Sequence, residues 1–149
     1  MTANGHHIVR LEFSSVFEML DFVQVVSDHV SHSIGMDDDA SHWISVAIRE
    51  SVINAIKHGN RNDSSKHVHV VFETAMSAAS GPELLIRVRD EGEGFDPETV
   101  ANPLEPENLL KSSGRGIFLI RNFMDDVQLQ RAPEGGMEIL MVKRAARGV

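Results

Sequence analysis

The sequence predicts a single α+β domain over residues 1–149, in which helices and a sheet form a two-layer α/β sandwich. The chain is 42% hydrophobic and 24% charged, which suits one soluble domain with one hydrophobic core. The expected order of elements is strand, helix, helix, strand, strand, long loop, helix, strand, strand. Helices segregated between runs of strands favour an α+β sandwich.

The first elements are a strand and a helix. Residues 7–13 are expected to form a strand, because Val9, Leu11 and Phe13 fall on one side of an alternating pattern. A helix is expected to follow, because Ser15 and Glu18 have the spacing of a capping box.

The second helix is expected from about Ala40 to His58. The acidic run Asp37–Asp39 offers an N-cap and a favourable charge at its start, and Gly59 offers a C-cap at its end. Apolar residues cover nearly its whole circumference, which indicates burial. Yet Glu50 and Asn54 stand four residues apart on one face. This pair is either a narrow solvent-facing stripe or part of a binding site.

Two strands are expected next, over residues 66–74 and 84–90. In the second of them, Asp90 shares its face with three apolar residues, namely Leu84, Ile86 and Val88. Asp90 should therefore point toward the core, where an unpaired carboxylate is costly. It is either an acceptor for a ligand donor or the start of an ordinary Asx turn.

The glycine- and proline-rich segment of residues 91–116 is long for a loop in a compact domain, and such loops are usually functional or disordered. Gly92 and Gly94 would let a ligand approach the backbone, although they also suit a plain turn.

A glycine-rich turn, Gly114–Arg115–Gly116, precedes a helix expected over Ile117–Asp126. Free N–H groups at a helix start, together with a guanidinium, suit an anion such as phosphate. A flexible hinge is the alternative. Residues 127–144 are expected to form a hairpin with its turn at 133–136.

Composition excludes several functions. A net charge of −8 argues against duplex nucleic acid as a partner, and the absence of cysteine rules out disulfides and thiolate chemistry. We expect a cytoplasmic protein with no membrane segment, because no signal peptide or long apolar run is present. His67 and His69 share one face of a strand, but no third ligand has a suitable spacing, so we expect a solvated face.

Three motifs in this order resemble the Bergerat-fold ATPases, and most of all the bacterial anti-sigma-factor serine-protein kinases. They are RESVINAIKHGN (49–60), DEGEGFDP (90–97) and GRGIFLIRNFMDDV (114–127). The resemblance implies a Bergerat ATP-binding fold, in which a mixed sheet is covered by helices on one face. It also implies ATP and Mg²⁺ as cofactors.

The resemblance implies a role for each site residue. Asn54 would ligate Mg²⁺, Glu50 would act as general base on the attacking hydroxyl, and Asp90 would accept from the adenine amino group. The implied glycines beside the adenine are Gly92 and Gly94, and the implied phosphate loop is Gly114, Arg115 and Gly116.

The implied function is phosphorylation of a serine on an anti-anti-sigma protein, combined with sequestration of a sigma factor. Two alternatives stay open, namely a nucleotide-dependent protein-binding module without kinase activity and a stand-alone ATPase. A homodimer is also left open, because members of that family often dimerise. No direct contact with nucleic acid is expected.

Overall fold

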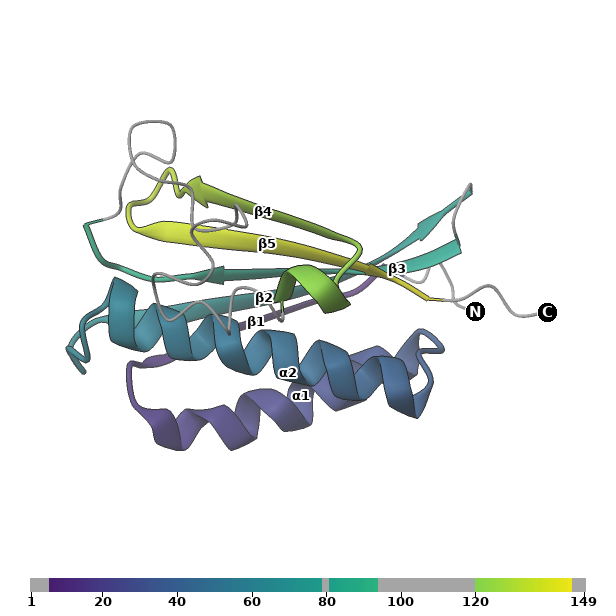
Figure 1. Cartoon of the computed structure of the whole chain (residues 1–149), viewed down its shortest axis with the longest axis horizontal. Helices are drawn as coiled ribbons and strands as arrows, with labels where there is room; N and C mark the ends of the chain where they lie inside the picture. The colour runs from purple at the N-terminus through teal and green to yellow at the C-terminus, as the bar shows by residue number, and fades with distance from the viewer. Residues whose placement is uncertain (1–5, 79–80, 94–119, 146–149) are drawn as a thin grey trace.

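The structure is a computed structural model that describes residues 6–78, 81–93 and 120–145. Two long helices lie on one face of a five-stranded sheet (Figure 1), which confirms the predicted α+β class and its two layers. The strands are β1 (Ile8–Ser14), β2 (His67–Ser77), β3 (Gly81–Arg89), β4 (Asp126–Arg131) and β5 (Met137–Arg144). The helices are α1 (Leu20–Ser33), preceded by a 3₁₀ turn (Phe17–Met19), and α2 (Asp38–Asn54), followed by a π turn (Ala55–Gly59).

The sheet has the strand order β1-β2-β3-β5-β4, and every neighbouring pair of described strands is antiparallel. The prediction of a mixed sheet is therefore wrong for this part of the chain. The reason is that α1 and α2 form a helical hairpin, which returns the chain to the end of the sheet where β1 finished. β2 then runs back along β1, whereas a single crossover helix would have made the two strands parallel.

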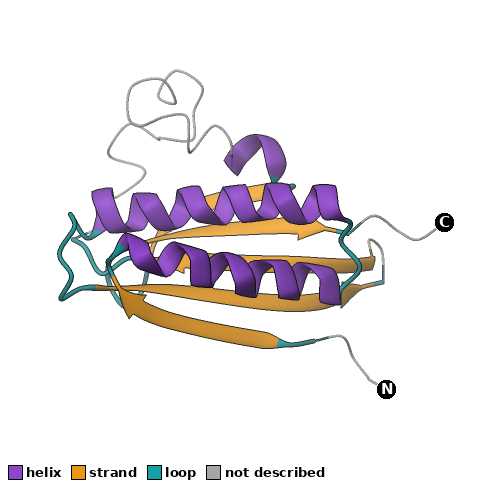
Figure 2. Ribbon diagram, turned by 90° about the horizontal axis from the view of Figure 1, so that it is seen from below, coloured by secondary structure: helices purple, strands orange, loops and turns teal. Residues whose placement is uncertain are grey.

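The hydrophobic core lies between the sheet and the two helices, which cover the same face of the sheet (Figure 2). The inward residues of β2 and β3 alternate with outward ones, as predicted from their period of two. Core side chains with at most 2% exposure include Val68, Val70, Phe72, Leu84, Ile86 and Val88 from the strands, and Ile44, Ile48, Val52 and Ile56 from α2 and its π turn.

The two expected helix caps have different outcomes. Asp37 is the N-cap of α2, as predicted, because its side chain accepts a hydrogen bond from the Ala40 amide at 2.8 Å. The capping box of Ser15 and Glu18 is wrong, since the first helical turn has no side-chain cap. Instead, the Ser15 hydroxyl donates to the Lys66 carbonyl at 2.7 Å and so ties the end of β1 to the start of β2.

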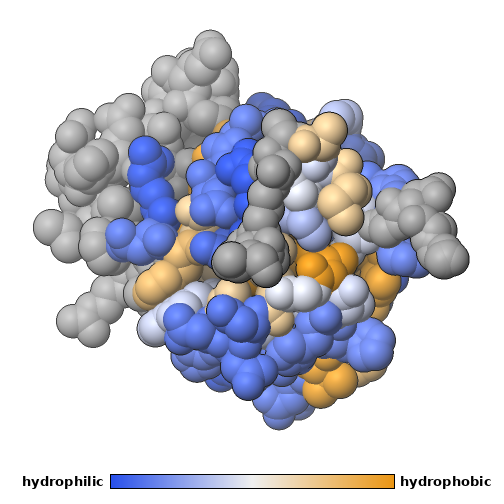
Figure 3. Space-filling view, turned by 90° about the vertical axis from the view of Figure 1, so that its right-hand side faces the viewer, coloured by the Kyte–Doolittle hydropathy of each residue, from blue (hydrophilic) through white to orange (hydrophobic). Residues whose placement is uncertain are grey.

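The end of the molecule near the two chain termini is mostly hydrophilic, with small and separate hydrophobic patches (Figure 3). Such scattered apolar residues are ordinary on a protein surface. Among the described residues, none of the helices combines the length and the apolar character needed to cross a bilayer.

Candidate functional site

Asp90 follows directly after β3 and is buried, with 6% of its surface exposed. Its Oδ1 atom accepts hydrogen bonds from the amides of Gly92 at 2.9 Å and Met137 at 3.1 Å. The bond to Gly92 is an Asx turn, so this alternative from the sequence is also observed. Oδ2 accepts no hydrogen bond from the described residues. One carboxylate oxygen is thus held by backbone amides, and the other lies against the backbone of Gly59 without a hydrogen bond from the described residues.

Three glycines surround the Asp90 carboxylate. A Cβ atom on Gly59 would overlap Oδ2, and a Cβ atom on Gly136 would overlap the Asp90 carbonyl oxygen. A Cβ atom on Gly92 would overlap the carbonyl oxygen of Gly59. The cradle around the Asp90 carboxylate is therefore made of backbone from the π turn, the segment after β3 and the β4–β5 turn. A side chain at any of the three glycine positions would fill it.

The role of Gly59 differs from the predicted helix C-cap. The helix does not end in a left-handed glycine here, because positive φ angles occur later, at Arg61 (54°) and Asn62 (60°). Gly59 is instead the last residue of the π turn. A glycine is required at this position because a Cβ atom would overlap Asp90. Single π turns within helices often mark functional sites.

Glu50 and Asn54 lie one helical turn apart near the end of α2, and both are half-buried. They are neither a fully solvated stripe nor part of the core. The π turn that continues α2 beyond Asn54 contacts Asp90 through the backbone of Gly59.

The remaining predicted site residues, Gly94, Gly114, Arg115 and Gly116, lie outside the described residues.

The residues that are described still fit the implied cofactors. A carboxamide and a carboxylate oxygen on α2 are the ligand type that Mg²⁺ prefers, and Mg²⁺ keeps several waters besides. The Asp90 carboxylate, with one oxygen that accepts no hydrogen bond from the described residues, suits a ligand that carries an N–H donor.

Asn60 is a site residue that sequence reasoning missed, because it was read only as a turn former. It is fully buried, and its Nδ2 donates to Ser15 Oγ at 2.7 Å and to the His67 carbonyl at 2.9 Å. Its Oδ1 accepts from the Glu91 amide at 2.7 Å. Asn60 therefore fixes the segment that contains Asp90 to β1 and β2.

A stacked aromatic pair anchors the helical turn of residues 120–123 to α2. The rings of Trp43 and Phe123 stack with centroids 4.0 Å apart and planes 16° apart, and Ile120 is fully buried. Of the helix expected over Ile117–Asp126, residues 120–123 are helical, and the expected end is wrong because β4 begins at Asp126.

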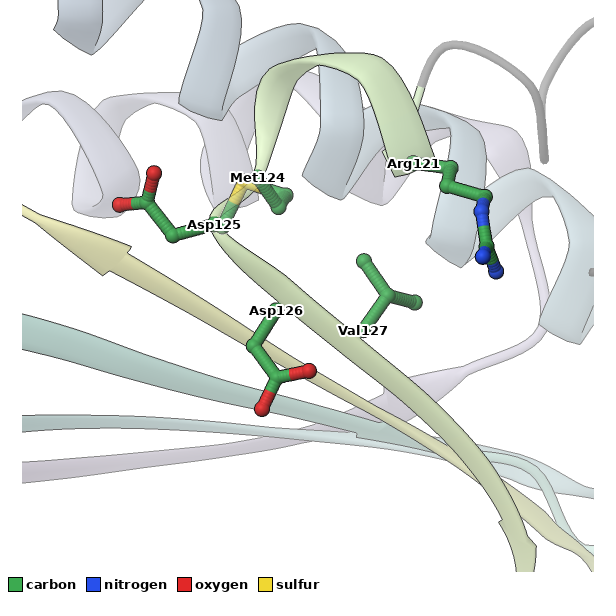
Figure 4. A pocket seen from close by; sticks show the side chains of 5 residues that line it. All are labelled: Arg121, Met124, Asp125, Asp126 and Val127. Atoms are coloured by element: carbon green, nitrogen blue, oxygen red, sulfur yellow. The ribbon is translucent and has the colours of Figure 1, made fainter.

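A hollow of ≈ 260 Å³ lies between this helical turn and the start of β4 (Figure 4). It is lined by Arg121, Met124, Asp125, Asp126 and Val127. Figure 4 shows Arg121 and Asp125 on opposite sides of it. None of the predicted site residues that the structure describes lines this hollow, and Asp125 already accepts a hydrogen bond from the Arg144 amide at 2.6 Å. The hollow is thus separate from the Asp90 cradle.

Comparison with protein families supports the motif assignment. Residues 18–143 match the family described as the histidine kinase-like ATPase domain. The match includes α2, the Asp90 cradle and the β4–β5 hairpin. The predicted family resemblance is confirmed.

Named relatives are similar over nearly the whole chain. An anti-sigma F factor of Oceanobacillus iheyensis is 33% identical over 143 residues, covering 93% of this chain and 93% of the relative. The corresponding protein of Bacillus subtilis is 29% identical, with the same coverage. A serine-protein kinase RsbW of Oceanobacillus iheyensis is 27% identical over 149 residues, covering 96% of this chain and 90% of the relative.

A solved structure has the same fold. The crystal structure of the RsbU and RsbW domains of a Mycobacterium tuberculosis protein superposes with a TM-score of 0.64 and 18% identity. The match covers 96% of this chain but 34% of that longer chain. At this identity, the likeness bears on the fold alone.

Proposed function

The chain belongs to the family of histidine kinase-like ATPase domains, and from this premise we propose that it is an ATP-binding anti-sigma regulator with serine-protein kinase activity. The observation that carries the proposal is the buried Asp90 carboxylate in its glycine cradle, with one oxygen held by backbone amides and the other without a hydrogen bond from the described residues. The similarity to an anti-sigma F factor and to a serine-protein kinase supports the regulatory role.

The nucleotide is proposed to bind between α2 and the segment after β3. Asp90 accepts a hydrogen bond from the adenine amino group, and Gly92 and Gly94 lie beside the base. On the phosphate side, Asn54 holds Mg²⁺, which offsets phosphate charge when bound. The proposed phosphate loop consists of Gly114, Arg115 and Gly116. The half-buried position of Asn54 on the helix that contacts Asp90 supports this arrangement.

Glu50 is proposed as the general base. It stands one turn before Asn54 on α2, and its carboxylate can accept the proton of a serine hydroxyl as that oxygen attacks the terminal phosphate. The serine oxygen forms the new bond to phosphorus, and ADP leaves. No side chain of this protein becomes a covalent intermediate.

The proposed partners are a small anti-anti-sigma protein, which carries the accepting serine, and a sigma factor, which the protein sequesters. Both would be met in the cytoplasm. The names of the relatives support this choice, and the charge of −8 fits a regulator that contacts proteins rather than nucleic acid. A homodimer is compatible with the proposal and is not required by it.

Single-turnover transfer of labelled phosphate to a candidate anti-anti-sigma protein tests the proposal. Glu50→Gln keeps the shape of the side chain but removes its basicity, so it should bind Mg-ATP as the natural protein does. Transfer should fall by at least about two orders of magnitude, because a positioned base contributes about 10²–10⁴-fold. Arg49→Gln is the matched control, since Arg49 is the exposed neighbour on α2 and should transfer normally.

The outcomes separate the alternatives. Equal transfer by Glu50→Gln and the natural protein would exclude Glu50 as the base. Absence of transfer by the natural protein, with ATP-dependent capture of the partner intact, would replace the kinase with a nucleotide-dependent binding module. ATP hydrolysis that is indifferent to any partner would instead identify a stand-alone ATPase.

A further inference from the structure

Four charged or imidazole side chains gather on the face of the sheet opposite the helices. Glu12 comes from β1, His67 and His69 come from β2, and Glu91 follows β3 by two residues. The strand register sets the group, because Glu12 lies directly opposite His69. His67 Nδ1 and Glu12 Oε2 are 2.6 Å apart, and His69 Nε2 and Glu91 Oε2 are 2.7 Å apart.

The spacing of three of these side chains suits a metal ion. Ligand atoms of Glu12, His69 and Glu91 all lie within 4.8 Å of one another. His69 Nδ1 and Glu12 Oε1 are 3.8 Å apart, which is too long for a hydrogen bond. Two ligands that each lie about 2.0–2.2 Å from one zinc ion must be within about 4 Å of each other. The Glu12 oxygen faces Nδ1 of the imidazole and the Glu91 oxygen faces Nε2, so a side chain has to turn for all three to bind one ion.

We propose that Glu12, His69 and Glu91 form a binding site for a divalent transition-metal ion of the zinc type. One imidazole nitrogen with carboxylate oxygens is a donor set that suits zinc, and it leaves a fourth position for water. The proposal does not depend on the kinase function, and the site lies on the opposite face of the sheet from α2.

The surroundings orient the ligands. His67 positions Glu12 through the 2.6 Å bond of its side chain, and its backbone amide donates to Glu91 Oε1 at 2.9 Å. Such contacts to ligating carboxylates raise metal affinity. Arg89 lies opposite His69 in the strand register. Its guanidinium is paired with Glu134 at 3.7 Å, which is an acid outside the proposed metal site.

The sequence had suggested a solvated face, because no third ligand was near the two histidines along the chain. That expectation missed Glu12 and Glu91, which the strand register brings from distant positions. A metal ion here would join β1 and β2 to the segment after β3. Through the bond from the Glu91 amide to Asn60 Oδ1, it would also stiffen the segment that contains Asp90.

Calorimetric titration of the full chain with zinc chloride, without nucleotide and after treatment with a chelator, tests the proposal. We expect saturable binding of one ion per chain, which excess Mg²⁺ does not displace, because imidazole is a poor ligand for Mg²⁺. His69→Gln should weaken the affinity by more than about tenfold, since even indirect partners of metal sites contribute about 10–100-fold. Glu12→Gln should weaken it as well and serves as the second variant if His69→Gln fails to fold.

His29→Gln is the matched control, because His29 is an exposed histidine on α1 and should leave zinc affinity unchanged. Circular dichroism of each variant verifies folding. Zinc affinity that is unchanged in both His69→Gln and Glu12→Gln would overturn the proposal and place any bound ion elsewhere, such as at His6 and His7. Absence of saturable binding to the natural protein would overturn it too.

Discussion

The backbone of Gly59, at the end of the π turn after α2, packs directly against the carboxylate of Asp90 at the end of β3. This contact joins the helix that carries Glu50 and Asn54 to the proposed adenine acceptor. Any Cβ atom at position 59 would overlap Asp90, so a glycine sets the spacing between helix and strand. The φ angle of Gly59 is not in the left-handed region, so an alanine would suffer from this overlap alone.

Gly59→Ala should therefore displace the Asp90 carboxylate and weaken nucleotide binding. Losing a hydrogen bond to a charged group costs about 1.5–3 kcal/mol, which is roughly ten- to a hundredfold in affinity. Calorimetry with ADP measures the effect. Lys57→Ala, an exposed change in the same π turn, is the control and should bind as the natural protein does. Unchanged ADP affinity in Gly59→Ala would show that the cradle does not hold the nucleotide.

Asn54→Ala should remove the Mg²⁺ dependence of ATP affinity while leaving the fold intact. The carboxamide oxygen is the proposed protein ligand of the ion, and half-buried Asn54 is not part of the hydrophobic core. ATP titrations with Mg²⁺ and with a chelator, on the same preparation, give the comparison. If the variant keeps the full Mg²⁺ dependence, the ion is held by other residues.

Two buried serines should respond to alanine in opposite ways. The Ser27 hydroxyl is fully buried and has no hydrogen-bond partner in the part of the chain that the structure describes, so Ser27→Ala should be neutral or stabilising. Ser15 donates to the Lys66 carbonyl and accepts from Asn60, so Ser15→Ala should destabilise by about 1–3 kcal/mol. Urea denaturation measures both changes. A large loss of stability in Ser27→Ala would reveal a partner for that hydroxyl.

Local patterns in the sequence predicted the structural features that depend on residues close together in the chain. The period of two along β3 placed Asp90 on the core side, because Leu84, Ile86 and Val88 share its face and are buried. The acidic residue before α2 was identified as its N-cap for the same reason, since the cap bonds an amide only three residues away.

Contacts between distant segments could not be predicted in this way. Asn60 forms its three hydrogen bonds with segments that are distant in the sequence, and Glu12 lies opposite His69 on a neighbouring strand. Both arrangements depend on the strand register and on where the helical hairpin returns the chain. The packing of Gly59 against Asp90 has the same origin. The family resemblance supplied the roles of Glu50 and Asn54, which periodicity alone left open between a solvated stripe and a site.

Asp90→Asn gives the most direct test of the nucleotide site, with ADP titrated by calorimetry. Asparagine retains an oxygen for the amides of Gly92 and Met137, so the fold should persist, but its amide group replaces the free carboxylate oxygen with a donor. Asp126→Asn, on an exposed position of β4, is the control. We expect ATP and ADP affinity both to fall by roughly ten- to a hundredfold in Asp90→Asn. ADP affinity equal to that of the natural protein would exclude Asp90 as the adenine acceptor.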